Sequence, residues 1–137
     1  MNFSDPAKHE AGVKTLRLLQ QLLWNGAFTF WLSHGTLLGA VRNQDFIPHD
    51  DDIDIGMWVA RSDDDIRHWL EQHGFRFHVE FGKAGDLHQY AFWSPFDVYT
   101  DLFFYIAGKK KVWTAIWEDK DHPHKQVFPD YWWVHRY

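Results

Sequence analysis

The amino-acid sequence predicts an α+β domain in which helices pack on a mixed β-sheet. Helical and strand-like segments alternate in the first half of the chain, and strand-like segments dominate the second half. The chain has 137 residues, of which 45% are hydrophobic and 19% aromatic. A chain of this size can bury roughly two thirds of the surface that its unfolded form exposes. Because no internal repeat or low-complexity linker divides the sequence, residues 1–137 are expected to form a single domain.

The first half of the chain combines helix and strand signals. Ser4, Asp5 and Pro6 are typical of a helix start, with a capping side chain followed by Pro in the first turn, and leucines at helical spacing continue this helix to Asn25. The next segments are expected to form a strand (residues 28–32), a short helix (36–42), a second strand (53–59) and a second long helix (62–74). The last of these begins with Ser62 and three acidic residues, a typical helix-capping pattern.

The second half of the chain consists mainly of strand-like segments. Apolar and aromatic stretches between turn residues are expected to form strands over residues 75–81, 88–93, 98–106 and 112–117. A hairpin turn is expected at residues 108–111. From Glu118 onward the sequence is polar and then aromatic without a clear period, so no further element is predicted there.

The composition excludes several classes of protein. The chain has no Cys, so it cannot form a disulfide or a thiolate metal site, and this is consistent with a reducing compartment. No apolar run approaches the ~20 residues of a membrane-spanning helix. The N-terminus lacks the basic and apolar regions of a signal peptide. We therefore expect a soluble cytoplasmic protein without a transmembrane segment.

The net charge of −5 is concentrated in one window. Residues 50–65 contain seven Asp and one Arg, a charge of −6, whereas the remaining residues contain 13 Lys and Arg against 12 Asp and Glu. A general nucleic-acid-binding protein needs a basic face, so nucleic acid is not expected as a partner. The acidic window is the segment in which we expect the chemistry.

Asp52 and Asp54 are the strongest candidates for a metal site. Strand side chains alternate between faces, so these acids share one face while Ile53 and Ile55 point to the core. Two carboxylates about 7 Å apart at their Cα atoms can converge on one divalent cation, which offsets their repulsion. Such pairs commonly hold Mg²⁺ or Mn²⁺ together with substrate phosphate. Asp50 is an additional candidate ligand.

The acidic run has two other interpretations. A run of Asp is often only a solvated loop, but such a loop has no need for β-branched residues between the acids. A calcium loop would match Asp at positions 50, 52 and 54, yet its sixth and twelfth positions are Ile55 and Arg61 instead of Gly and Glu. The calcium loop is therefore excluded.

Asp101 is the candidate for a third carboxylate ligand. It lies inside the strongly strand-like segment 98–104, where a charge is costly unless it is paired. A metal ion shared with Asp52 and Asp54 would pair it. The alternatives are an edge strand that exposes Asp101 to water, or an ion pair with Arg or Lys.

Several segments together form a specific pattern. They are WLSHGTLLGAVR at residues 31–42, FIP at residues 46–48 and DDDIDIG at residues 50–56. In this combination they resemble the LicD family, which includes bacterial phosphocholine transferases and the animal proteins fukutin and fukutin-related protein. Within the family the pattern is most similar to fukutin, through WLSHGTLLG and the later FGK (81–83), DLFFY (101–105) and FP (128–129). The resemblance covers about residues 11–130.

The resemblance implies a nucleotidyltransferase-like fold and roles for individual residues. It implies donor-phosphate binding by Gly35 and Thr36, metal binding and catalysis by Asp52 and Asp54, and the third catalytic and metal-binding carboxylate at Asp101. The chemistry of the turn agrees, because Gly lets the backbone approach a phosphate and a helix N-terminus offers free N–H groups. Arg42, which follows the short helix, is a further candidate for phosphate binding, with a surface ion pair as the alternative.

The implied activity is the transfer of a phosphorylated small alcohol, of the phosphocholine or ribitol phosphate kind, from a CDP-linked donor to a glycan hydroxyl. Mg²⁺ or Mn²⁺ would bridge the diphosphate, and Asp101 would take the proton of the acceptor. One alternative is a nucleotidyltransferase that moves a nucleoside monophosphate to a small molecule. Another is a non-catalytic relative that binds nucleotide or a partner.

Two departures from the family pattern concern the ends of the chain. The N-terminal membrane anchor of animal members is not seen, and the sequence stops at Tyr137, before the family's usual C-terminal stretch. We therefore expect part of the acceptor side to be missing. Trp132 and Trp133 near the end would then leave an apolar patch through which the protein could self-associate.

Overall fold

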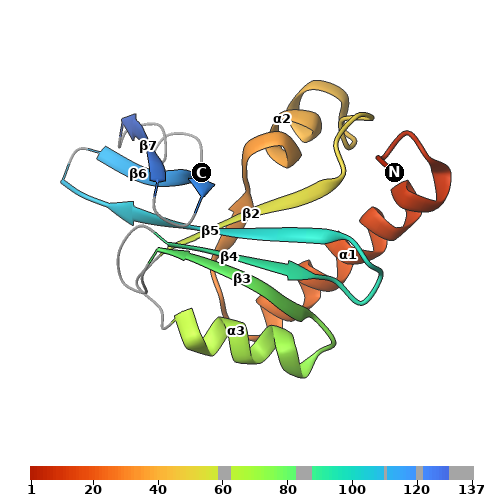
Figure 1. The fold of residues 1–137 in the computed structure, drawn as a ribbon, viewed down its shortest axis with the longest axis horizontal. Helices are drawn as coiled ribbons and strands as arrows, with labels where there is room; N and C mark the ends of the chain where they lie inside the picture. The colour runs from red at the N-terminus through yellow and green to blue at the C-terminus, as the bar shows by residue number, and fades with distance from the viewer. Residues whose placement is uncertain (59–62, 83–87, 110, 120–121, 130–137) are drawn as a thin grey trace.

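Three helices and a seven-stranded sheet make up the described part of the chain, which confirms the α+β class (Figure 1). A computed structural model describes residues 1–137 except 59–62, 83–87, 110, 120–121 and 130–137. The helices are α1 (Pro6–Asn25), α2 (His34–Asn43) and α3 (Asp63–Gln72). The strands are β1 (Phe30–Leu32), β2 (Asp52–Trp58), β3 (Arg76–Gly82), β4 (His88–Trp93), β5 (Tyr99–Ala107), β6 (Lys111–Asp119) and β7 (His122–Pro129).

The sheet is mixed, as the sequence predicts. Its main strands lie in the order β1-β2-β5-β4-β3, and β6 and β7 form a hairpin that continues from the end of β5. β2 and β5 run parallel, whereas the other neighbouring strands are antiparallel. The parallel pairing sets the register of the two central strands and places Asp54 directly opposite Asp101.

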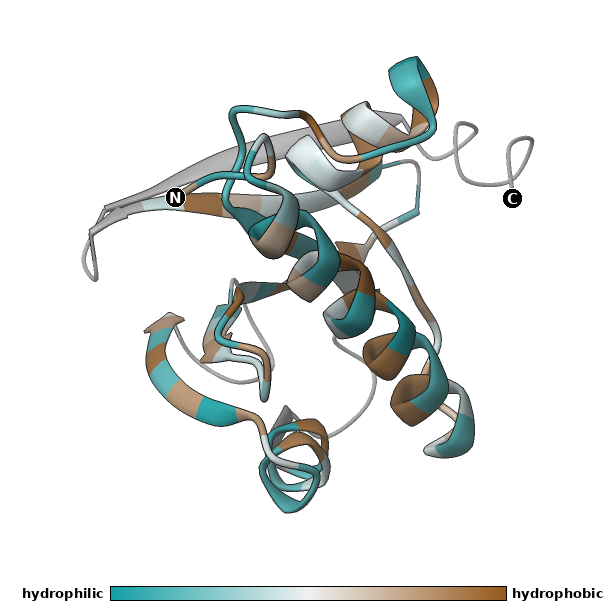
Figure 2. Ribbon diagram, turned by 90° about the vertical axis from the view of Figure 1, so that its right-hand side faces the viewer, coloured by the Kyte–Doolittle hydropathy of each residue, from teal (hydrophilic) through white to brown (hydrophobic). Residues whose placement is uncertain are grey.

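The main hydrophobic core lies on one face of the sheet, and a smaller cluster around Phe103 and Tyr105 lies on the other. Alternate residues of β2, β4 and β5, such as Ile53, Tyr90 and Leu102, are fully buried against apolar residues of α1 and α3. Figure 2 shows hydrophobic residues interspersed with hydrophilic ones along α1, as expected for a helix with one buried side. Because strand side chains alternate, the intervening residues of β2 and β5, among them the acids, lie on the opposite face.

Helix α1 begins as the sequence predicts. Pro6 is its first residue, and the Asp5 carboxylate accepts hydrogen bonds from the backbone N–H groups of Ala7 and Lys8, at 3.0 and 3.1 Å. Its buried leucines, Leu19 and Leu23 among them, join the core. Full burial of such a side chain contributes roughly 1.5–3 kcal/mol, so packing accounts for more of the helix stability than the cap does.

Some element boundaries differ from the prediction. β1 begins at Phe30 because Ala27 adopts a left-handed φ of 58° and Phe28 turns into the core before the strand begins. β7 was not predicted, since its sequence has no hydrophobic period. Its strand conformation follows from antiparallel pairing with β6, from Val112 opposite Phe128 to Asp119 opposite His122.

Two features of the sequence fall beyond the described part of the chain. The capping role of Ser62 and the apolar patch around Trp132 and Trp133 both lie outside the described residues. Self-association through that segment therefore stays a prediction. Within the described residues, no helix combines the length and the apolar character needed to cross a membrane.

Gly56 of β2 is expected to be sensitive to substitution. It pairs with Trp31 of β1, and a Cβ atom at Gly56 would overlap the indole, lying 2.6 Å from Trp31 Cε2. The indole is held between Trp58 and Tyr105, with ring centroids 4.7 and 5.2 Å away. We expect Gly56→Ala to lower the free energy of unfolding by about 1–3 kcal/mol, measured by denaturant titration. The penalty should shrink in a Trp31→Ala background, and an unchanged penalty there would contradict the steric explanation.

Candidate active site

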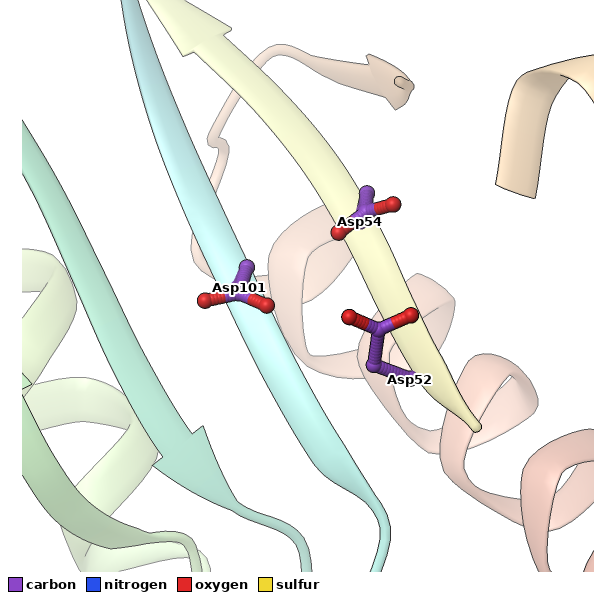
Figure 3. Close-up of side chains that lie close together, drawn as sticks. All are labelled: Asp52, Asp54 and Asp101. Carbon is purple, nitrogen blue, oxygen red and sulfur yellow. The ribbon is translucent and has the colours of Figure 1, made fainter. Parts of the chain in front are cut away.

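Asp52, Asp54 and Asp101 lie together on the face of the sheet opposite the core, on β2 and β5 (Figure 3). One carboxylate oxygen from each residue lies within 4.8 Å of the others. Asp54 and Asp101 are each only 7% exposed, whereas Asp52 is half-buried. Three oxygen ligands of the kind that Mg²⁺ and Mn²⁺ prefer are thus available at one point. We call this set the acid triad.

The local sequence explains how the acid triad forms. Ile53 and Ile55 are fully buried in the core, which confirms the predicted division of this strand into an acidic and an apolar face. Asp101 lies on a strand paired on both sides, so the alternative of an exposed edge strand is wrong. The Asp101 carboxylate accepts a 2.8 Å hydrogen bond from Gln89 Nε2 of β4, which fixes its orientation.

The electrostatics of the acid triad favour a bound cation. Burial, followed by repulsion from Asp52 and Asp101, raises the pKa of Asp54 to about 8. Burial also raises the pKa of Asp101 to about 7, against the lowering effect of the Gln89 hydrogen bond. The pKa of Asp52 is raised by burial and by Asp51 and Asp50. Ionising all three carboxylates is therefore costly unless a positive charge compensates them.

The start of α2 lies beside the acid triad. The Ser33 N–H donates to the Asp54 carbonyl at 3.0 Å, and the Asp54 N–H donates to Thr36 Oγ1 at 2.9 Å. A backbone hydrogen bond from Gly35 also lowers the pKa of Asp54, against the larger effect of burial. The Thr36 oxygen thus accepts a hydrogen bond that holds the helix against β2, while its O–H can still donate. Any phosphate contact at this turn would come from this hydroxyl and from backbone N–H groups at the positive end of α2.

Asp50 lies next to the same turn. A Cβ atom on Gly35 would lie 2.5 Å from Asp50 Oδ2, so the absence of a side chain at Gly35 leaves room for this carboxylate. Asp50 is half-buried, but among the described residues it does not belong to the set whose oxygens meet within 4.8 Å. Its contribution to metal binding stays a prediction.

The structure does not bring Arg42 next to the turn at Gly35 and Thr36. Arg42 is exposed and lies in the last turn of α2, seven residues after Gly35. At a rise of 1.5 Å per residue the two backbones are ~10 Å apart along the helix. A ligand would have to span this distance, or the long Arg side chain would have to fold back, for both to touch the same donor.

Residues on β4 and β5 complete the surroundings of the acid triad and were not predicted from the sequence. Tyr99 precedes Asp101 by two residues on the same face, and burial together with Asp101 and Asp52 raises its pKa to about 12. Its ring contacts Trp93, with centroids 4.9 Å apart. Sequence reasoning could have found Gln89, because it is a polar residue within an otherwise buried strand. It could not have found the Tyr99–Trp93 contact, because this contact depends on the register of β4 against β5.

Comparison with known protein families identifies the family of this chain. A family model described as the LicD/FKTN/FKRP nucleotidyltransferase domain matches residues 27–135, which include α2 and the acid triad. The chain belongs to the LicD family. The family resemblance predicted from the sequence is thereby confirmed.

Curated relatives of this LicD-family chain include fukutins. The human protein named "Ribitol-5-phosphate transferase FKTN" is 29% identical over 126 residues, which are 91% of this chain and 27% of the human protein. The mouse protein of the same name is 32% identical over 100 residues, covering 73% of this chain and 22% of the mouse protein. The chain thus spans about a quarter of the length of the curated relatives that it matches.

A solved structure supports the fold of this LicD-family domain. The lincomycin-bound lincosamide antibiotic adenylyltransferase LnuA superposes with a TM-score of 0.59 over 84% of this chain and 67% of its own. At 17% sequence identity this similarity concerns the fold alone. The predicted nucleotidyltransferase-like fold is confirmed.

Proposed function

We propose that this LicD-family domain transfers a phosphorylated small alcohol from a CDP-linked donor to a glycan hydroxyl. Membership of the LicD family and similarity to fukutins support a transferase of phosphorus-containing groups. Ribitol phosphate is the group named in the relatives' names, and phosphocholine is the other kind implied by the sequence resemblance. The observation that carries the proposal is the convergence of three carboxylates, two buried and one half-buried, beside a helix N-terminus.

The acid triad fits the metal that this chemistry needs. Its donor set consists of three carboxylate oxygens within 4.8 Å of one another, a ligand set suited to Mg²⁺ or Mn²⁺. When bound there, such a cation supplies positive charge that offsets the negative charge of the diphosphate and of the departing CMP. Asp52, Asp54 and Asp101 would hold it, with Asp50 as the additional candidate.

The positions of the residues support the remaining proposed roles. The turn at Gly35 and Thr36 would bind the donor phosphate through the backbone N–H of Thr36, because the Gly35 N–H already donates to Asp54, and Arg42 would bind it only by reaching along α2. The acceptor hydroxyl oxygen bonds to the phosphorus of the alcohol phosphate while the bond from that phosphorus to the CMP oxygen breaks. The hydroxyl proton passes to the Asp101 carboxylate, which lies on the β4 side of the acid triad.

Binding of CDP is expected to depend on the metal. Without a divalent cation, ionised carboxylates of the acid triad repel the diphosphate. We expect isothermal titration calorimetry with CDP to show an affinity at least about tenfold higher in Mg²⁺ or Mn²⁺ than in excess chelator, about 1.4 kcal/mol. Equal affinity under the two conditions would contradict the proposed role of the acid triad.

Product analysis separates this function from the alternative nucleotidyltransferase. Mass spectrometry of reactions with CDP-ribitol or CDP-choline and a glycan acceptor should detect CMP and the phosphorylated glycan. Release of pyrophosphate from a nucleoside triphosphate, with a nucleotide attached to the acceptor, would instead support nucleotidyl transfer. Binding of CDP without either product would support the non-catalytic alternative.

A further inference from the structure

A pocket of about 480 Å³ opens at the edge of the sheet where β2 and β5 begin. Three aromatic residues and three charged residues contribute to its lining: Trp93, Phe96, Tyr99, Lys8, Asp51 and Asp97. We propose that this pocket binds a sugar ring of the acceptor glycan. The inference rests on the proposed function, because it assigns the acceptor side of the same site.

The pocket adjoins the acid triad through two strands. Tyr99 precedes Asp101 by two residues on β5, so both side chains lie on the same face of the sheet. Asp51 directly precedes Asp52 at the start of β2. A molecule in this pocket would therefore lie at one end of the acid triad, beside Asp52, which pairs with Tyr99 across the two strands.

The order of the strands distinguishes the two sides of the site. The phosphate turn at Gly35 approaches Asp54 on β2, whereas Trp93 belongs to β4, the neighbour of β5 on the other side. In phosphoryl transfer the attacking oxygen and the leaving oxygen lie roughly in line on opposite sides of the phosphorus. With the donor phosphate at the Gly35 turn, the acceptor approaches from the opposite side, which the pocket reaches at Trp93 and at Phe96 and Asp97 of the turn between β4 and β5.

The lining of the pocket suits a sugar ring. The rings of Trp93 and Tyr99 meet edge to face, and His78 packs against Tyr99 with centroids 5.5 Å apart, which supports them. Phe96 is 38% exposed. A sugar presents C–H groups that pack on aromatic rings and hydroxyl groups that need polar partners, which Lys8 and Asp51 provide.

The charges of the pocket do not favour a cation over a neutral sugar. The ammonium group of choline also binds aromatic rings, but in this pocket it would meet the positive charge of Lys8 as well as the negative charge of Asp51. Asp97 is already paired with Arg76 at 2.6 Å, so its charge is largely compensated. A nucleobase could also stack on the aromatic rings, and the experiment therefore compares a nucleotide with sugars directly.

Fluorine NMR of the chain labelled with 5-fluorotryptophan tests the proposal. The signal that disappears in Trp93→Phe identifies Trp93. The probes are CDP and a panel of methyl glycosides of glucose, galactose, mannose and their N-acetylamino forms, each added in the presence of Mg²⁺. We expect at least one glycoside to shift the Trp93 signal, and CDP to leave it unshifted while CDP binding itself is detected by calorimetry.

Three variants test whether Trp93 contributes to glycoside binding and not to CDP binding. Trp93→Ala should weaken glycoside binding about tenfold or more and leave the dissociation constant for CDP within about twofold, whereas Trp93→Phe should retain most of the glycoside affinity. Trp24→Ala, at a Trp that is 78% exposed on α1, is the matched control and should change neither. Retained CDP binding also shows that Trp93→Ala is folded. If this variant does not fold, the shift of the wild-type Trp93 signal on addition of glycoside remains the test.

The outcomes that overturn the inference are distinct from those that overturn the proposed function. If no glycoside shifts the Trp93 signal, or if CDP shifts it and Trp93→Ala weakens CDP binding, the pocket is not the sugar site. Metal-dependent CDP binding would survive either result. If CDP shows no metal-dependent binding at all, the proposed function fails.

Discussion

Replacement of Asp54 by Asn is expected to abolish transfer while the fold survives. Asp54 is buried at the centre of the site, between the turn at Gly35 and Asp101. Asn has the same size but no charge, so the variant binds a divalent cation and the donor diphosphate less tightly. We expect CMP release to fall at least on the order of 10²–10³-fold, the loss that follows removal of one electrostatic contact to a transition state. Asp52→Asn is expected to behave similarly.

Stability measurements and a matched control separate catalysis from folding. Removing one of three neighbouring carboxylates relieves their repulsion, so the melting temperature of metal-free Asp54→Asn should equal or exceed that of the wild type. Asp65→Asn changes an exposed acid on α3, which packs on the opposite face of the sheet. Its CMP release should stay within about twofold of the wild type. If Asp65→Asn were as damaging as Asp54→Asn, the assignment of the acid triad would be wrong.

Metal-free protein is expected to lose stability as the pH rises from about 4 through about 8. The pKa of Asp54 is raised from 3.8 to about 8 and that of Asp101 to about 7, so the folded chain holds these protons more tightly than the unfolded chain. Their contribution to stability is complete below the unfolded pKa and is lost as the pH rises through the folded values. Melting temperatures in chelator across this range measure the effect.

The comparison of wild type with Asp54→Asn isolates the contribution of the acid triad. Burial lowers the pKa of His34 to about 4, and this group acts in the opposite direction, adding stability as the pH rises from about 4 to its unfolded pKa of 6.5. His34 is present in both proteins, so the difference between their melting temperatures should grow with pH. Added Mg²⁺ should stabilise the wild type more at pH 8 than at pH 5, because metal and protons compete for the same oxygens. A difference that shrinks with pH would contradict burial as the cause.

The sequence predicted the part of the site that depends on strand periodicity. The alternation of Asp52 and Asp54 with Ile53 and Ile55 requires a strand with one buried apolar face, and the structure has that strand. Asp101 was predicted by the same logic, because a charge inside an apolar strand needs compensation. Its position opposite Asp54 follows from the parallel pairing of β2 and β5, which periodicity alone does not specify.

The features that the sequence did not predict depend on pairing between distant segments. The contact of Trp93 with Tyr99 and the hydrogen bond from Gln89 to Asp101 need the register of β4 against β5. The hydroxyl of Thr36 illustrates a different limit of prediction from the sequence. A motif indicates that the residue lies at the start of a helix, but only the structure shows that its oxygen accepts the Asp54 N–H.

The parallel ladder between β2 and β5 also has a consequence for how the chain folds. It joins two segments that are separated in sequence by α3, β3 and β4, so its closure is among the least local events in folding. Hairpin β6–β7, by contrast, forms between neighbouring segments. Because Asp54 and Asp101 meet only when this ladder closes, folding intermediates without it lack the acid triad. The cation that we propose would then bind the native state in preference to earlier states, slow its unfolding, and couple the lifetime of the fold to the availability of metal.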